Sequence, residues 1–247
     1  MNVNLVRINN GRKEVTGMLQ VIGLKTDSSS QSISFNAEES TLVGIKGSSG
    51  ALQLLNCLYR TVIPESGQIW YKSSLLGRLD LIEATVSEIV KLRVHEMGLL
   101  NPLTAMIPKY SLSVTDIIAE RLLQQGCSVR QARTDSQNLL ERLRVDEKLW
   151  YTSPAVCSSE QRQCIDWARA LVARPRLFIL NESAADLLDG ITKQEILSVL
   201  KEMALNGTTV IGIFEEHGLW EREADQLLDI SCGPALSAKR DKLAYTF

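Results

Sequence analysis

One glycine-rich stretch constrains the fold of this chain more than any other. An apolar run, Thr41–Ile45, leads into Gly47-Ser48-Ser49-Gly50, and leucines then recur with helical spacing at Leu52, Leu54, Leu55 and Leu58. A strand, a glycine loop and a helix in this order form the layout of a phosphate-binding loop, whose backbone N–H groups and helix N-terminus attract anions. The stretch therefore predicts the scaffold of a phosphate site.

The two residues that do the chemistry in such a loop are missing. A working loop ends in Gly-Lys-Ser or Gly-Lys-Thr, where the lysine reaches the phosphates and the hydroxyl binds magnesium. Gly50 and Ala51 occupy those two positions. Lys46 lies four residues earlier, and two interpretations of it stay open: it reaches back over the phosphates, or it points into solvent. Solvent is favoured, because the loop normally directs only the lysine at the helix start inward.

The rest of the chain alternates between strand and helix patterns. Continuous apolar runs at Leu177–Leu180 and Thr208–Phe214 are typical of buried parallel strands. Strands that alternate with helices predict an α/β fold with a mainly parallel sheet covered on both faces. Gly126 and Gly207 are expected to end helices. The expected helices are Leu81–Arg93, Val114–Gln125, Arg130–Arg144, Glu160–Ala173 and Ile191–Asn206, of which the second and third form an all-helical block.

Composition and charge exclude several classes of protein. The formal charge of -2 over 247 residues provides no field that would draw the chain to nucleic acid. No apolar run approaches the length of a membrane span, so we expect no transmembrane segment. Five scattered cysteines and two histidines indicate no metal site. Residues 1–17 lack the apolar core of a secretion signal, and we expect a cytoplasmic protein.

Five motifs stand in an order that resembles an ATP-binding cassette (ABC) ATPase domain. They are the loop Gly44–Leu52, the turn and strand Pro64–Ile69, Cys157–Gln161 in the place of the family signature, Leu177–Ser183 in the place of Walker B, and Val210–Glu215 in the place of the switch strand. The resemblance spans roughly Met18 to Ile230, nearly the whole chain.

This resemblance implies a P-loop NTPase-like ABC nucleotide-binding domain. Such a domain has a mainly parallel sheet flanked by helices, an antiparallel β part near the N-terminus and a helical subdomain, here at about 103–160. We expect residues 1–17 to be an N-terminal extension and residues 18–247 to form a single ABC-type domain.

A narrower likeness is to the ABC subunit of the bacterial phosphonate carbon–phosphorus lyase system. It is carried by Asp80–Ala84 with Val90 and Leu92-Arg93, by Ile107-Pro108, by Val145–Trp150 and by Ile211–Phe214. That likeness implies a cassette protein that works in a multi-subunit complex without a membrane domain of its own.

The resemblance assigns a role to each motif position, and most functional residues are replaced. Gly50 stands at the position of the phosphate-binding lysine, and Ala51 at that of the magnesium-binding hydroxyl. Asn181 replaces the Walker B aspartate, and a neutral amide is a weaker partner for a hard dication. Glu182 remains at the position of the general base. The candidate anion-binding residues are Gly44, Lys46, Gly47, Ser48, Ser49, Gly50, Ala51 and Leu52.

The remaining motifs also differ from the family pattern at their functional positions. Pro102 falls near the position of the glutamine that senses magnesium, and Glu215 at that of the switch histidine. The region Lys25–Asp27 has no aromatic ring on which adenine could stack.

The signature, which completes a partner's site in a head-to-tail dimer, keeps Ser158 and Gln161. Ser159 and Glu160 replace the two glycines that let a helix N-terminus approach a phosphate, and the glutamate would repel it.

Three hypotheses follow. The first is a pseudo-ATPase that requires no cofactor and acts as a structural or regulatory subunit, with an intact ABC subunit, a second copy or an enzyme complex as its protein partner. The alternative is an ATP-hydrolysing subunit of a phosphonate lyase or transport system, which would use ATP and Mg with Lys46 and Glu182. The third is binding of a small anion or nucleotide at Gly47–Ala51 without hydrolysis.

Overall fold

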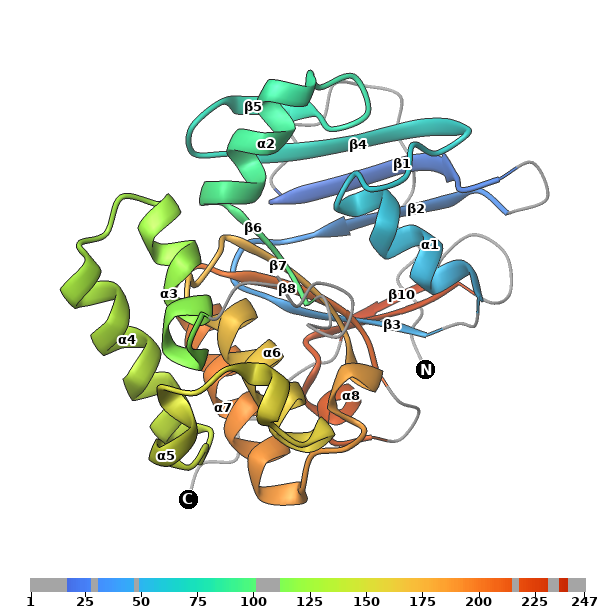
Figure 1. Ribbon diagram of the computed structural model, residues 1–247. Coiled ribbons are helices and arrows are strands. Elements are labelled where there is room, and N and C mark those ends of the chain that lie inside the picture. The colour runs from blue at the N-terminus through green and yellow to red at the C-terminus, as the bar shows by residue number, and fades with distance from the viewer. Residues whose placement is uncertain are drawn as a thin grey trace.

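A computed structural model of the chain describes residues 17–27, 31–46, 49–100, 112–214, 218–230 and 236–239 (Figure 1). Its strands form two sheets. The antiparallel sheet has the order β2-β1-β4-β5, and the second sheet has the order β10-β9-β3-β8-β7-β6. The strands are β1 (Leu19–Lys25), β2 (Ile33–Ala37), β3 (Leu42–Lys46), β4 (Ser66–Ser73), β5 (Gly77–Asp80), β6 (Met97–Leu99), β7 (Leu177–Asn181), β8 (Thr209–Ile213), β9 (Gln226–Asp229) and β10 (Leu236–Lys239).

The second sheet is parallel from β9 to β6, and only its edge pair β10–β9 is antiparallel. This is the mainly parallel sheet expected from the apolar runs, with the antiparallel part near the N-terminus. In the parallel register Ile45 of β3 lies opposite Ile213 of β8, which lies opposite Asn181 of β7. The ends of these strands therefore bring the glycine loop, the Walker B position and the switch strand to one edge.

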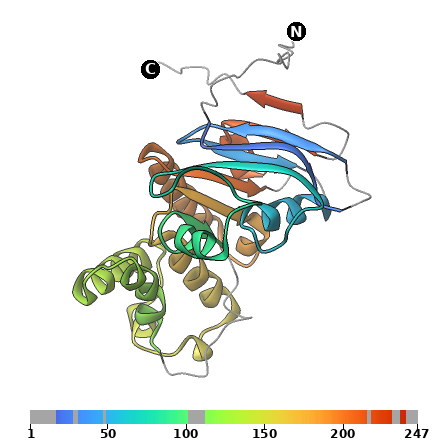
Figure 2. The ribbon, with the colours of Figure 1, turned by 90° about the horizontal axis from the view of Figure 1, so that it is seen from above.

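Eight α-helices among the described residues surround the sheets. They are α1 (Ser49–Leu58), α2 (Val86–His95), α3 (Val114–Gln124), α4 (Val129–Arg142), α5 (Glu147–Trp150), α6 (Ser159–Leu171), α7 (Gly190–Leu205) and α8 (Leu219–Glu223). Helices α3 and α4 form the expected all-helical block, and α5 contacts both of them. Figure 2 shows this block on the opposite side of the molecule from β10. Within the described residues, no helix combines the length and apolar character needed to cross a membrane.

Two main hydrophobic cores lie on opposite faces of the parallel sheet. One joins α1 to both sheets and includes Leu54, Leu19 and Ile211, each fully buried. The other lies beneath the sheet and includes Trp167 of α6 and Leu200 of α7. Because α1 is held between two sheets, the position of the glycine loop before it is set by the core.

The helix expected over Leu81–Arg93 was wrong at its start. It begins at Val86, because Thr85 forms a capping box with Glu88: the Thr85 Oγ1 accepts from the Glu88 backbone N–H, and the Glu88 carboxylate accepts from the Thr85 N–H. Asp80 Oδ1 accepts from the backbone N–H of Ile82 at 3.0 Å and holds the preceding residues in a turn. The expected helix ends were right at Gly126 and Gly207, whose φ angles are 92° and 101°.

Candidate functional site

The glycine loop has the strand–loop–helix form that the sequence predicts. At the start of the helix, an apolar side chain is buried where the family has a polar residue. β3 ends at Lys46 and α1 begins at Ser49. Ala51, at the position of the magnesium hydroxyl, is fully buried in the core between the sheets, whereas Leu52 is 51% exposed. A buried methyl group therefore stands where the family chemistry requires a metal ligand. Gly47 and Ser48 lie outside the described residues.

Gly44 lies inside β3 rather than in the loop. A Cβ at this position would lie 2.7 Å from Leu227 Cδ2 and 2.9 Å from Phe214 Cδ2. The described contacts of Gly44 thus explain the glycine by close packing between strands, and its role in anion binding stays a prediction.

Lys46 forms an ion pair that neither interpretation of the sequence included. Its Nζ lies 2.6 Å from Oε1 of Glu221 in α8. The Lys46 side chain is 30% exposed and the Glu221 side chain is 5% exposed. Because an unpaired buried carboxylate is costly, this contact draws the lysine toward α8 and joins the end of β3 to it. No local pattern in the sequence signals a partner so far along the chain.

Asn181 and Glu182 lie at the end of β7, as predicted for a Walker B position. The Asn181 side chain accepts a hydrogen bond from the Ser183 backbone N–H at 3.2 Å and caps a 3₁₀ turn over Glu182–Ala185. Glu182 is 5% exposed. The amide oxygen that would have to serve a metal is thus engaged in holding the turn.

The signature segment starts α6 with a complete capping box. Ser158 Oγ accepts from the Gln161 backbone N–H at 3.2 Å, and Gln161 Oε1 accepts from the Ser158 N–H at 2.8 Å. Ser159 and Glu160 occupy the exposed first turn. The helix N-terminus is therefore stabilised by its own side chains, and the carboxylate of Glu160 disfavours a phosphate beside it.

An aromatic cluster, Trp167, Phe214 and Trp220, underlies this edge of the sheet. The Trp167 and Trp220 rings meet edge to face with centroids 5.1 Å apart, and the Phe214 and Trp220 centroids are 6.2 Å apart. Trp167 Nε1 donates to the Ala184 carbonyl at 3.0 Å. The cluster thus connects α8, the end of β8 and the turn after Glu182. The positions Pro102 and Glu215 lie outside the described residues, so their predicted roles stay predictions.

Burial raises the pKa values of two cysteine thiols near the signature segment. Burial, followed by the charges of Glu160 and Asp189, raises the pKa of the Cys164 thiol to about 12. Burial also raises the pKa of Cys157. These thiols are therefore protonated at neutral pH and are poor nucleophiles or metal ligands. Among the described residues, no group of three or more His, Cys, Asp or Glu side chains is placed to hold a metal ion.

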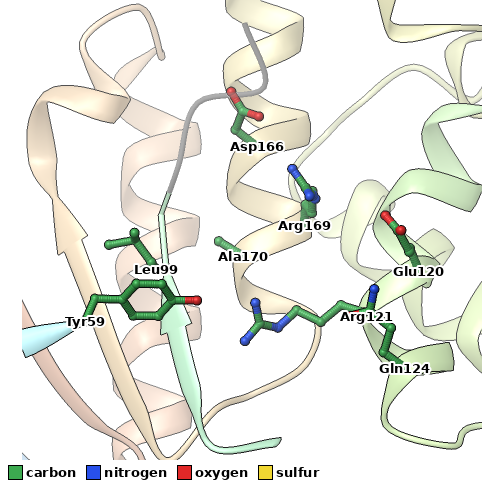
Figure 3. Close-up of a pocket in the computed structure, with 8 residues that line it drawn as sticks. All are labelled: Tyr59, Leu99, Glu120, Arg121, Gln124, Asp166, Arg169 and Ala170. Carbon is green, nitrogen blue, oxygen red and sulfur yellow. The ribbon is translucent and has the colours of Figure 1, made fainter. Parts of the chain in front are cut away.

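A second feature is the groove between the helical block and the sheets (Figure 3). It has a volume of about 180 Å³. Arg121 of α3 reaches across it and donates through Nη2 to the Arg93 carbonyl at 2.7 Å and to the Met97 carbonyl. Gln125 Nε2 donates to the Val94 carbonyl at 3.0 Å. The lining residues are Tyr59, Leu99, Glu120, Arg121, Gln124, Asp166, Arg169 and Ala170.

Comparison with known proteins identifies the family. The family model described as ABC transporter matches residues 30–185, more than half of the chain, and the chain therefore belongs to that family. The lipoprotein-releasing system ATP-binding protein LolD of Shewanella frigidimarina is 27% identical over 194 residues, which cover 78% of this chain and 77% of LolD. The arginine transport ATP-binding protein ArtP of Haemophilus influenzae is 28% identical over 203 residues, 81% of this chain and 82% of ArtP.

Solved structures agree on the fold. A dimeric ATP-binding cassette in a post-hydrolysis state with ADP and Pi superposes with a TM-score of 0.77 at 20% identity, covering 91% of this chain and 100% of that one. The relatives described here belong to lipoprotein release and arginine transport, so they give no support to the narrower likeness to a phosphonate subunit.

The residues present do not fit the magnesium–ATP that the family chemistry uses. Ala51 offers no hydroxyl, Gly50 offers no cation, and the Asn181 amide caps a turn. A carboxylate beside phosphate oxygens, as at Glu160, adds repulsion.

Proposed function

We propose that this chain is a cassette subunit of a transport system that does not hydrolyse ATP in its own glycine loop. The main observation is that Gly50 and Ala51, the second fully buried, occupy the positions of the phosphate-binding lysine and the magnesium-binding hydroxyl. Lys46 at the end of β3 is in an ion pair with Glu221. Phosphoryl transfer depends on positioned charge at the transferred group, and one cation and one metal ligand are missing together. The transport assignment is supported by the names of the relatives.

A second candidate is an ATP-hydrolysing subunit, and one observation favours it. Glu182 retains the position of the general base, and the related proteins are named as ATP-binding. This candidate requires Glu182 to act on a water molecule that the remaining loop residues position. A link to phosphonate metabolism also stays a prediction.

The groove of Figure 3 supports a role for a protein partner. Its walls combine the Tyr59 ring and Leu99 of β6 with charged side chains of α3 and α6. A side chain of a partner inserted there would contact α3 and Tyr59, the residue after α1, together. We propose that an intact cassette subunit, a second copy or a membrane-bound transport component is the partner.

Calorimetry with ATP, with and without magnesium, tests the proposed loss of function. We expect magnesium to add no affinity, because Ala51 offers it no ligand and the Asn181 amide oxygen caps a turn. The double variant Gly50→Lys/Ala51→Ser should gain magnesium-dependent ATP affinity, and the single variant Gly50→Lys is the matched control for charge alone. Magnesium-dependent binding by the unmodified chain would refute the proposal.

A further inference from the structure

A groove opens at the amino end of β3, at the edge of the sheet opposite the glycine loop. We call it the rear groove, and its volume is about 560 Å³. It is formed by the residues that enter β3, the last turn of α7 and the start of β9. The lining residues are Glu38, Ser40, Thr41, Leu42, Lys201, Ala204, Leu205, Glu223, Asp225 and Gln226.

The rear groove combines negative charge with an apolar wall. Three carboxylates line it, from Glu38, Glu223 and Asp225, and its one ammonium, Lys201 Nζ, lies 2.6 Å from Oε2 of Glu223. The C-terminal end of α7 adds partial negative charge. Leu205 at that end is 87% exposed, the largest exposed fraction among the large apolar side chains described. The groove thus suits a segment that presents both cations and large apolar groups.

The path of the chain leads to this groove. β10 runs antiparallel to β9, and its last residue, Lys239, lies opposite Gln226, which lines the groove. Since Gln226 is the first residue of β9, the backbone leaves β10 at the same end of the sheet where the groove opens. The eight residues that follow, 240–247, read Arg-Asp-Lys-Leu-Ala-Tyr-Thr-Phe. An extended segment of this length reaches about 26 Å.

We propose that residues 240–247 dock in the rear groove of their own chain. Arg240 and Lys242 supply two cations to a groove whose carboxylates outnumber its one ammonium. Leu243, Tyr245 and Phe247 supply the apolar groups that cover Leu205. Docking ties down the edge strand β10, whose outer side is otherwise a template for unwanted pairing. This surface is separate from the glycine loop and independent of the proposed loss of hydrolysis.

Hydrogen exchange of the last turn of α7 tests the proposal. Three proteins are compared: the full chain, a chain ending at Lys239, and the full chain with Arg240→Glu and Lys242→Glu. We expect amides of residues 203–206 to exchange about tenfold faster in both altered proteins, a change of about 1.4 kcal/mol in local opening. Amides of β7 in the core should keep their rates, which verifies folding, and a synthetic peptide of residues 240–247 should restore protection to the shortened chain.

A matched surface variant and a dilution series complete the test. Leu205→Asp should reproduce the loss of protection, whereas Leu187→Asp, at a side chain 54% exposed that does not line the groove, should leave it unchanged. Equal exchange in all three proteins would overturn the proposal. Protection that disappears on dilution of the full chain would also overturn it, because the groove would then be occupied by a second copy.

Discussion

The ion pair between Lys46 and Glu221 gives the sharpest prediction about the altered loop. Replacing Lys46 by methionine keeps most of the side-chain volume and removes the charge that faces a carboxylate only 5% exposed. Loss of one partner of a buried pair costs about 3–5 kcal/mol; Lys46 is itself 30% exposed, so we expect a loss of about 3 kcal/mol in the free energy of unfolding.

Urea denaturation followed by tryptophan fluorescence measures this loss, because Trp220 lies beside Glu221 in α8. The double variant Lys46→Met/Glu221→Gln should recover most of the loss, since the buried negative charge is then removed together with the lysine charge. Lys72→Met is the matched control: Lys72 lies 3.1 Å from Glu39 with both side chains more than 40% exposed, and its removal should cost less than about 1 kcal/mol. A loss for Lys46→Met no larger than that of Lys72→Met would refute the account of the pair.

Three further predictions concern the framework around the loop. Burial raises the pKa of Glu96, but hydrogen bonds from Ser74, Ser73 and Tyr71 outweigh it and hold the pKa below the ordinary value of 4.5. The stability from Glu96 is therefore present above pH 4.5 and lost as pH falls, so Glu96→Gln should lower the free energy of unfolding by about 1–3 kcal/mol at pH 7 and much less at pH 3, measured by urea titrations. Trp220→Ala should lower the same free energy by about 3–5 kcal/mol, measured by denaturation followed by circular dichroism, because the indole is fully buried between two rings. Arg121→Ala should speed hydrogen exchange at the start of β6 while amides of β8 keep their rates; unchanged exchange at β6 would contradict its role in joining the helical block to the sheets.

Much of the framework follows from local sequence signals. The strand–loop–helix order around Ala51, the continuous apolar strand β7 and the glycines that end helices all follow from periodicity and backbone preference. The start of α6 follows from Ser158 and Gln161, a capping pair three residues apart. Such features were predictable because their interacting groups are neighbours in the chain.

For the site, the residue positions were predictable from the sequence, but the contacts of their side chains were not. Asn181 was expected as a weak metal partner, but its use as a turn cap depends on the path of the chain after β7. Lys46 pairs with Glu221, and the ring of Trp167 packs against that of Trp220. The partners are far apart in the sequence, and no local sequence pattern predicts either contact. The early start predicted for α2 failed because helical spacing in Leu81–Glu83 gave way to the Asp80 turn and the Thr85 cap.

We propose that the glycine loop of this cassette does not support phosphoryl transfer. Steady-state hydrolysis of magnesium–ATP is compared between the unmodified chain and Glu182→Gln, because the resemblance places Glu182 at the position of the general base. We expect the same background rate for both proteins. Turnover by the unmodified chain that falls about tenfold or more in Glu182→Gln would contradict it.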